Sequence, residues 1–183
     1  MSVEAHRAAG PASVPCFVLT ISDTRTIDTD TSGARIASLL EDDGHTIAGR
    51  AIVKDDVAAV TAAVTKALAG PARAIITTGG TGIAARDTTF EALSALIERP
   101  MPGFGELFRM VSYHEIGPAA MLSRACAGIT RGRVLFVLPG SQNAVALAMN
   151  KLVLPELGHI VSELTKGGPL DGVDAIEHWL DKQ

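Results

Sequence analysis

Short apolar runs alternate with amphipathic stretches along this chain, and this alternation restricts its fold more than any other feature. Buried strands are predicted over Cys16–Ser22, His45–Lys54 and Ala74–Thr78, where apolar residues gather. Between them, Thr31–Asp43 and Asp56–Ala69 carry their apolar side chains on one helical face. Strands that alternate with helices in this way predict an α/β fold with a mostly parallel sheet covered on both faces.

The second half of the chain is expected to continue the same pattern. Helices are predicted over Thr88–Ile97, Gly103–Tyr113, Gln142–Leu154 and Glu156–Leu164. Thr88 and Glu91 have the spacing of a capping box, and Pro155 suits the first turn of the last helix. Two apolar runs, Arg124–Ile129 and Arg133–Leu138, flank a short turn and predict a local antiparallel hairpin.

Length and composition favour one globular domain without a nucleic-acid or membrane partner. The 183 residues are 47% hydrophobic, which suits a single packed core. Residues 1–14 are expected to form a mobile tail, residues 15–166 the domain, and residues 167–183 a C-terminal extension. A net charge of −4 with scattered Lys and Arg argues against nucleic acid, and no apolar run approaches the ~18–20 residues that span a bilayer.

The two cysteines, Cys16 and Cys126, lie far apart and belong to no cluster of Cys and His residues. A zinc site and a disulfide framework are therefore not expected, and a reducing, cytoplasmic setting is favoured. Cys126 lies in an apolar run and is expected to be a buried thiol.

Ligands of parallel α/β sheets bind beyond the carboxyl ends of the strands, so the loops after those ends carry the functional predictions. The segment Thr78-Gly79-Gly80-Thr81-Gly82 follows a predicted strand directly. Its glycines allow backbone N–H groups to approach an anion, although a tight turn would tolerate the same residues. Gly80–Ala85 also matches the dinucleotide pattern GxGxxA, but it follows the third strand and no helix is predicted before Thr88, which argues against a nicotinamide-dependent oxidoreductase.

Three aspartates lie next to these loops and have both structural and functional interpretations. Asp55 and Asp56 begin a predicted helix, and one of them is expected to cap it. Asp87 either caps the following helix or, if Thr88 does so, is free to bind a metal ion. Two acids at adjacent strand ends beside an anion site would suit Mg²⁺ bound to phosphates.

Other polar residues at the same edge remain ambiguous from composition alone. The loop Ser22–Arg25 and the following Asp30–Gly33 are rich in hydroxyl groups, which is equally typical of a solvated loop. Leu138–Ser141 forms a second strand-to-helix turn, in which Ser141 is a natural N-cap. Arg124 is either a phosphate partner or a surface charge.

Five motifs in order resemble the MoaB/MogA-type molybdopterin-binding family of molybdenum cofactor biosynthesis, and the likeness runs from about residue 16 to residue 165. They are Thr20–Asp23 with Asp30–Gly33, Thr78–Gly82 with Asp87, Pro102–Glu106, Leu122–Arg124 and Leu138–Ser141. Ile52–Asp56 agrees as well, and Phe108–Gly117 is closer to the MoaB branch, in which inactive members are known.

The resemblance implies a three-layer α/β/α molybdopterin-binding fold and a homo-oligomer, trimeric or hexameric. It implies adenylyl transfer from ATP to molybdopterin with Mg²⁺, with pyrophosphate as the second product; binding of molybdopterin without chemistry is the alternative. Asp55 and Asp87 match the acids around the metal and the reacting phosphates. Residues that match the substrate-binding positions are Ser22, Asp23, Thr78, Gly79, Gly80, Thr81, Gly82, Glu106, Ser123, Arg124, Pro139, Gly140 and Ser141. Phe104, Phe108, Met110 and Tyr113 would be the candidate subunit interface if they were exposed.

Overall fold

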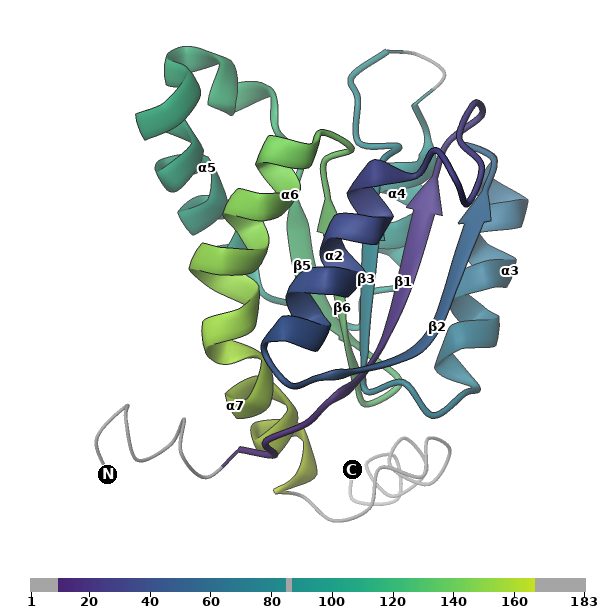
Figure 1. Cartoon of the computed structure of the whole chain (residues 1–183). Helices are drawn as coiled ribbons and strands as arrows, with labels where there is room; N and C mark the ends of the chain where they lie inside the picture. Colours follow the sequence, from purple (N-terminus) through teal and green to yellow (C-terminus); the bar gives the residue numbers. More distant parts are fainter. Residues whose placement is uncertain (1–9, 85–86, 167–183) are drawn as a thin grey trace, which may run out of the picture.

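A six-stranded mixed sheet organises the chain in the computed structural model, which describes residues 10–84 and 87–166 (Figure 1). Its strand order is β2-β1-β3-β6-β5-β4. The strands are β1 (Pro15–Ile21), β2 (Thr46–Val53), β3 (Ala74–Thr78), β4 (Arg99–Pro100), β5 (Cys126–Thr130) and β6 (Arg133–Leu138). The first four in the spatial order are parallel, whereas β5 runs antiparallel to both of its neighbours.

Helices cover both faces of this sheet and complete the predicted three-layer α/β/α fold (Figure 1). One face packs against α2 (Thr31–Asp42), α5 (Pro102–Ile116) and the long helix at the end of the domain. The other face packs against α3 (Val57–Leu68) and α4 (Thr89–Ala95). Each face of the sheet has its own cluster of buried apolar side chains, because successive residues of a strand point to opposite faces.

The hairpin between β5 and β6 is confirmed, and its turn has the backbone that a two-residue connection requires. Arg131 and Gly132 have φ angles of 46° and 69°. Two left-handed residues match the right-handed twist of the flanking strands, so the strands pair without splaying. The short edge strand β4 was not predicted, because its two residues extend only to pair with Gly128 and Ile129.

The last helix differs from the prediction of two separate helices. The chain runs without a break through α6 (Gln142–Ala148), a π-helical turn (Met149–Val153) and α7 (Leu154–Thr165). Pro155 lacks an N–H group and would crowd the preceding turn of a regular α-helix. The π-helical turn ends at Val153, two residues before Pro155, and allows the helix to continue.

This continuous helix of 24 residues is long and apolar enough, by length and composition alone, to cross a membrane. This continuous helix was not expected from the apolar runs, because the sequence predicted two helices separated at Pro155. Four of its side chains are fully buried in the apolar cluster on the sheet face that packs against α2 and α5: Val145, Met149, Val153 and Leu157. The helix therefore occupies the position of a core helix in the three-layer fold.

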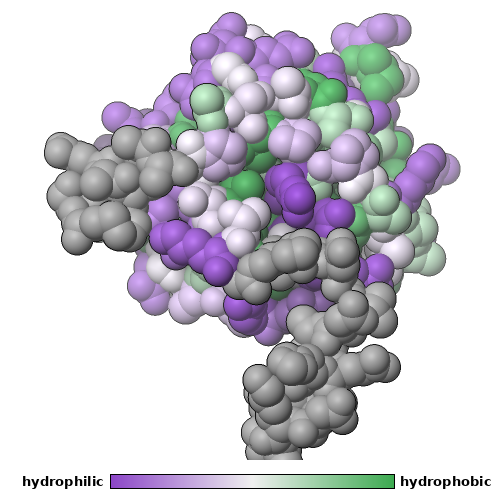
Figure 2. Space-filling model, turned by 90° about the horizontal axis from the view of Figure 1, so that it is seen from below, coloured by the Kyte–Doolittle hydropathy of each residue, from purple (hydrophilic) through white to green (hydrophobic). Residues whose placement is uncertain are grey.

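The parallel strands end together at one end of the molecule, at the top of Figure 1, and the described chain enters from the opposite end. Figure 2 views that opposite end, where hydrophilic residues lie among hydrophobic ones. The expected tail over residues 1–14 is too long, because Val14 is fully buried and its N–H group donates to Nδ1 of His45. Residues 1–9 and 167–183 lie outside the described residues.

Candidate functional site

The strand order changes direction at β1: β2 is added on one side of β1, and β3 on the other. Loops that leave such a switch point diverge and open a crevice at the carboxyl ends of the strands. A cleft of about 120 Å³ lies there. It is lined by Thr20, Ile21, Ser22, Arg25, Asp30, Ser32, Thr78, Gly79 and Gly140.

The glycine-rich loop after β3 needs its glycines for conformation and for space. Gly79 and Gly80 have φ angles of 99° and 65°, which side chains disfavour. A Cβ atom on Gly79 would overlap the carbonyl oxygen of Ile21, and one on Gly80 would lie 2.7 Å from Cβ of Thr89. The loop thus lies directly against the end of β1 and the start of α4.

Backbone N–H groups of this loop are available to a ligand. The N–H group of Gly79 donates to the carbonyl oxygen of Leu138 over 3.2 Å. Within residues 10–84 and 87–166, the N–H groups of Gly80, Thr81 and Gly82 have no hydrogen-bond acceptor. Adjacent unpaired amides in a left-handed turn form a concave site for an anion.

The turn after β6 packs beside this loop. Thr78 Oγ1 donates to the carbonyl oxygen of Pro139 over 2.9 Å, and Ser32 Oγ donates to that of Gly140 over 2.8 Å. A Cβ atom on Gly140 would lie 3.3 Å from Cα of Gly79, so the two turns are in close contact. Ser141 Oγ accepts from the N–H group of Ala144 and caps α6, as its position predicted.

Asp55 and Asp56 have different partners. Asp56 Oδ1 accepts from the N–H group of Ala59 over 2.8 Å and caps α3, which confirms that one of the pair is a cap. The N–H group of Asp55 donates to Oδ1 of Asp23 over 3.2 Å, and Asp55 Oδ1 accepts from Oγ1 of the buried Thr89. Asp23, Asp55 and Thr89 therefore join the loops after β1 and β2 to the start of α4.

Asp87 folds back toward the glycine-rich loop. Its Oδ2 accepts from the N–H group of Ala84 over 2.9 Å, and a Cβ atom on Gly82 would overlap this same oxygen. The predicted capping box is wrong, because the side chain of Thr88 makes no capping hydrogen bond and Glu91 pairs with Arg124 instead. Asp87 therefore lies beside the amide groups that could bind an anion.

The described residues contain no group of three or more His, Cys, Asp or Glu side chains that could bind a metal ion by themselves. Mg²⁺ in phosphate-transfer sites commonly takes only one or two carboxylates and completes its shell with phosphate oxygens and water. Asp55 contacts Thr89 at the start of α4, and Asp87 lies against Gly82 in the glycine-rich loop, so these two carboxylates are the candidates for such a partial site.

Arg124, which precedes β5, is half-buried, and its guanidinium contacts the glycine-rich loop. Its Nε donates to the carbonyl oxygen of Thr81, and its Nη2 donates to those of Gly82 and Asp87. Nη1 pairs with Glu91, and the guanidinium lies 4.7 Å from the ring centre of Phe90. The structure thus uses Arg124 to hold the loop.

A second, larger cavity of about 420 Å³ lies between α4, α5 and β5. Its walls are mostly apolar, and its charged lining residues are Glu106, Arg109 and Arg124. Cys126 also lines it, 3.9 Å from the hydroxyl oxygen of Ser94. Burial raises the pKa of the Cys126 thiol, which keeps it protonated and makes it a poor nucleophile.

The predicted site residues fall into two connected groups. Ser22, Thr78, Gly79 and Gly140 line the small cleft, whereas Glu106, Ser123 and Arg124 line the larger cavity. The glycine-rich loop lies between the two groups and contacts both. Thr89 and Arg109 were not among the predicted site residues. The only signal for Thr89 was its position two residues after Asp87, and Arg109 had none beyond its place on α5.

Comparison with known proteins gives concordant matches over almost the whole domain. A family model described as a probable molybdopterin binding domain matches residues 17–159. Molybdenum cofactor biosynthesis protein B of Halalkalibacterium halodurans is 52% identical over 169 residues, covering 91% of this chain and 99% of the relative. The protein of the same name from Bacillus subtilis is 50% identical over 171 residues, with the same coverage.

Solved structures agree with these sequence matches. A crystal structure of a molybdenum cofactor biosynthesis protein B is 52% identical with a TM-score of 0.82, covering 84% of this chain and 97% of that one. The tungsten cofactor synthesizing protein MoaB from Pyrococcus furiosus is 36% identical with a TM-score of 0.78, covering 85% and 99%. A MogA structure is 28% identical with a TM-score of 0.75, covering 84% and 99%.

Proposed function

Since this chain belongs to the family of probable molybdopterin binding domains, we propose that it is a molybdopterin adenylyltransferase of molybdenum cofactor biosynthesis. In this reaction a phosphate oxygen of molybdopterin attacks the α-phosphorus of ATP. A new P–O–P bond forms, the bond to the β-phosphate breaks, and pyrophosphate leaves with the electron pair. The products are adenylyl-molybdopterin and pyrophosphate.

One observation carries the proposal: the glycine-rich loop, whose amides have no acceptor among the described residues, lies against Asp87 at Gly82 and against Thr89, the partner of Asp55, at Gly80. Phosphoryl-type transfers need positioning and charge neutralisation more than covalent help from the protein. The N–H groups of Gly80, Thr81 and Gly82 are suited to bind phosphate oxygens. The small cleft and the larger cavity lie on either side of this loop. Two substrates bound in them would bring their phosphates together at the loop.

The carboxylates of Asp55 and Asp87 would hold Mg²⁺ against the triphosphate. When bound, the ion supplies positive charge that neutralises the leaving pyrophosphate. Asp55 is oriented by the hydroxyl group of Thr89, and Asp87 by the N–H group of Ala84. Ser22 and Asp23 lie at the end of β1, where they would border the nucleotide.

The experiment that tests this proposal is pyrophosphate release from ATP and Mg²⁺ by the purified protein, with and without molybdopterin. We expect release only when molybdopterin is present. Molybdopterin binding without release would overturn the enzymatic proposal and favour the alternative, a protein that binds molybdopterin without chemistry.

A homo-oligomer, trimeric or hexameric, and a cytoplasmic location belong to the same proposal. The outward side of α5 and the following 3₁₀ turn (Gly117–Leu122) expose large apolar side chains. This α5 surface consists of Leu107, Met110, Tyr113, Ile116, Met121 and Leu122. Of the four residues first considered for an interface, Phe104 and Phe108 are buried in the core, and only Met110 and Tyr113 are exposed. Free Cys16 and Cys126 suit a reducing compartment.

A further inference from the structure

A groove of about 360 Å³ lies away from the candidate site, where the described chain enters the domain. One wall is the entering chain between residues 11 and 15, and the other is the end of α7 with Val161, Ser162 and Thr165. The parallel strands begin here and end at the candidate site, so the two regions lie at opposite ends of the sheet (Figure 1). The proposed function leaves this groove without a role.

Close contacts hold the entering chain against α7 and against the sheet. A Cβ atom on Gly10 would lie 2.6 Å from the carbonyl oxygen of Gly158, which places the entering chain directly on α7. The N–H group of Arg73 donates to the carbonyl oxygen of Pro15 over 2.7 Å. Both walls are therefore fixed by the fold, and the groove is preformed.

Arg73 gives the groove a positive charge that the described part of the chain does not neutralise. It lines the groove, is half-buried, and forms no ion pair with a carboxylate of residues 10–84 or 87–166. Arg133 lies near it and has no such partner among these residues either. Burial and the positive charge of Arg73 lower the pKa of Arg133. Two neighbouring guanidinium groups without a counterion favour a negatively charged occupant.

Residues 167–183 lie outside the described residues, and their sequence offers both apolar side chains and negative charge. Ile176, Trp179 and Leu180 have the i, i+3, i+4 spacing of one helical face. An amphipathic helix of this kind binds by laying its apolar face into a groove. Residues 1–9 suit the groove less, because they contain one acid, one arginine and no aromatic residue. The C-terminal segment carries four acids against one lysine: Asp171, Asp174, Glu177, Asp181 and Lys182.

The segment begins beside the groove and is long enough to return to it. Thr165 lines the groove, and Lys166 is the C-cap of α7. The following Gly167–Pro169 is typical of a sequence that ends a helix and turns the chain. The chain from Thr165 to Trp179 can span up to about 45 Å. A tethered segment has an effective concentration in the millimolar range at a site within its reach.

We propose that this groove is the docking site of the chain's own C-terminal segment, residues 167–183. In this arrangement Trp179 enters the groove between the entering chain and α7, and a carboxylate of the segment pairs with Arg73. The docked segment closes the groove and joins residues 167–183 to the start of the domain. The inference does not rest on the proposed function.

Trp179 is the only tryptophan in the sequence, so its fluorescence reports on the segment directly. The test is acrylamide quenching of the intact protein, compared with a synthetic peptide of residues 167–183. We expect the emission of the protein to be blue-shifted and its quenching constant to be several-fold lower than that of the peptide, because the docked ring is shielded from water and from the quencher. Quenching equal to that of the peptide would overturn the proposal.

Two substitutions in the groove should release the segment. R73E replaces attraction with repulsion, and S162E places a carboxylate in the wall formed by α7. Both should shift the emission to the red and raise the quenching constant toward that of the peptide. R73K keeps the charge and should retain most of the protection. R35E is the matched control and should behave like the wild type, since Arg35 is exposed on α2 and does not line the groove.

Circular dichroism shows whether each variant is folded. If R73E is not, S162E decides alone, since glutamate is well tolerated inside a helix. Wild-type quenching in the folded groove variants would show that Trp179 is protected elsewhere, and the proposal would be wrong.

Dilution of the wild-type protein identifies the occupant. Docking within one chain predicts an emission maximum that does not depend on protein concentration. A red shift on dilution would show that the segment docks on a second copy, which would overturn the assignment to the same chain.

Discussion

Asp55 and Asp56 follow β2 directly, and their carboxylates contact different parts of the molecule. Asp56 is exposed and caps α3, whereas Asp55 is half-buried and accepts a hydrogen bond from Thr89. The pair offers an internal comparison, because the same substitution at either position removes one negative charge from nearly the same place. Under the proposed function, Asp55 would act in catalysis, whereas Asp56 stabilises α3 as its N-cap.

We expect Asp55→Asn to lower molybdopterin-dependent pyrophosphate release by about 100-fold or more, because it removes charge that would hold the metal ion. Asp56→Asn should retain the rate and the stability, since Asn is as good an N-cap as Asp. Rates and melting temperatures of both variants are measured together. Equal losses of activity would show that neither carboxylate has a specific role.

Gly82 in the glycine-rich loop and Gly103 in the first turn of α5 give a second comparison. A Cβ atom on Gly82 would overlap Oδ2 of Asp87, whereas one on Gly103 would meet nothing within 4 Å. Gly82→Ala should therefore displace the Asp87 carboxylate and lower the rate of pyrophosphate release, with a small change in stability. Gly103→Ala should leave the rate unchanged and raise the free energy of unfolding by up to about 1 kcal/mol, because Gly103 lies in α5.

Measurement of the rate against Mg²⁺ concentration separates these effects. A displaced Asp87 should raise the Mg²⁺ concentration needed for half-maximal release in Gly82→Ala. An unchanged Mg²⁺ dependence would remove Asp87 from the proposed metal site.

At the scale of the elements, apolar runs and turn residues predicted those strands and helices whose bounds depend on nearby residues. The strands appear within one or two residues of their predicted bounds because each is an apolar run bounded by turn residues. The hairpin followed from Arg131 and Gly132 lying between two such runs. Pro155 misled the prediction, since packing against the sheet keeps the helix continuous across it. The strand β4 exists only through its partner β5.

The same distinction applies to the site. The glycine-rich loop and its acids could be predicted because they follow strand ends, which a parallel sheet brings to one edge. The contacts of Arg124 could not, since its acceptors lie 33 to 43 residues away in sequence and meet it only after folding. The cavity that holds Arg109 is formed by α4, α5 and β5 together, so no single segment of the sequence indicates it.

His45 ties the start of β2 to the residue before β1. Its Nδ1 accepts the N–H group of Val14 over 3.2 Å, which requires an unprotonated nitrogen. Burial lowers the pKa of His45 below its usual 6.5, while Asp43 opposes this effect. Because the unfolded chain takes up the proton first, His45 contributes stability that is fully present above pH 6.5 and is lost as pH falls toward the folded pKa.

We therefore expect the free energy of unfolding to fall more steeply below pH 6.5 in the wild type than in His45→Asn. The amide oxygen of Asn can accept the N–H group of Val14 but does not titrate. Denaturant unfolding at several pH values measures the difference. Parallel pH profiles for the two proteins would exclude His45 as the cause of acid sensitivity.

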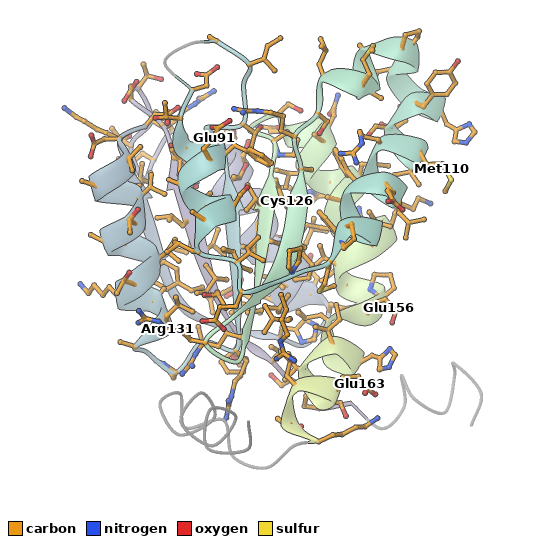
Figure 3. The ribbon with its side chains drawn as sticks, turned by 180° about the vertical axis from the view of Figure 1, so that it is seen from behind. Glu91, Met110, Cys126, Arg131, Glu156 and Glu163 are labelled. Carbon is orange, nitrogen blue, oxygen red and sulfur yellow. The ribbon has the colours of Figure 1, made fainter. Side chains whose placement is uncertain are left out.

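At the scale of the whole molecule, the α5 surface is the feature that a single subunit leaves unexplained. Met110 and Tyr113 are 53% and 58% exposed, and Figure 3 shows Met110 pointing away from the body of the protein. Adjacent exposed large apolar side chains mark a contact surface. Their continuity along one helix and the following turn suits a second copy of this chain.

We expect Met110→Glu to dissociate the proposed oligomer, because it would bury a charge in an apolar contact between subunits. Val57→Glu is the matched control: Val57 is 44% exposed, lies outside the α5 surface, and begins α3, where an acidic residue is favourable. Sedimentation velocity gives the mass of each species. Since Met110 lies one residue after Arg109, pyrophosphate release is measured on the same samples. A smaller species with full activity would place the complete site within one subunit, whereas an unchanged mass would show that this surface is not the interface.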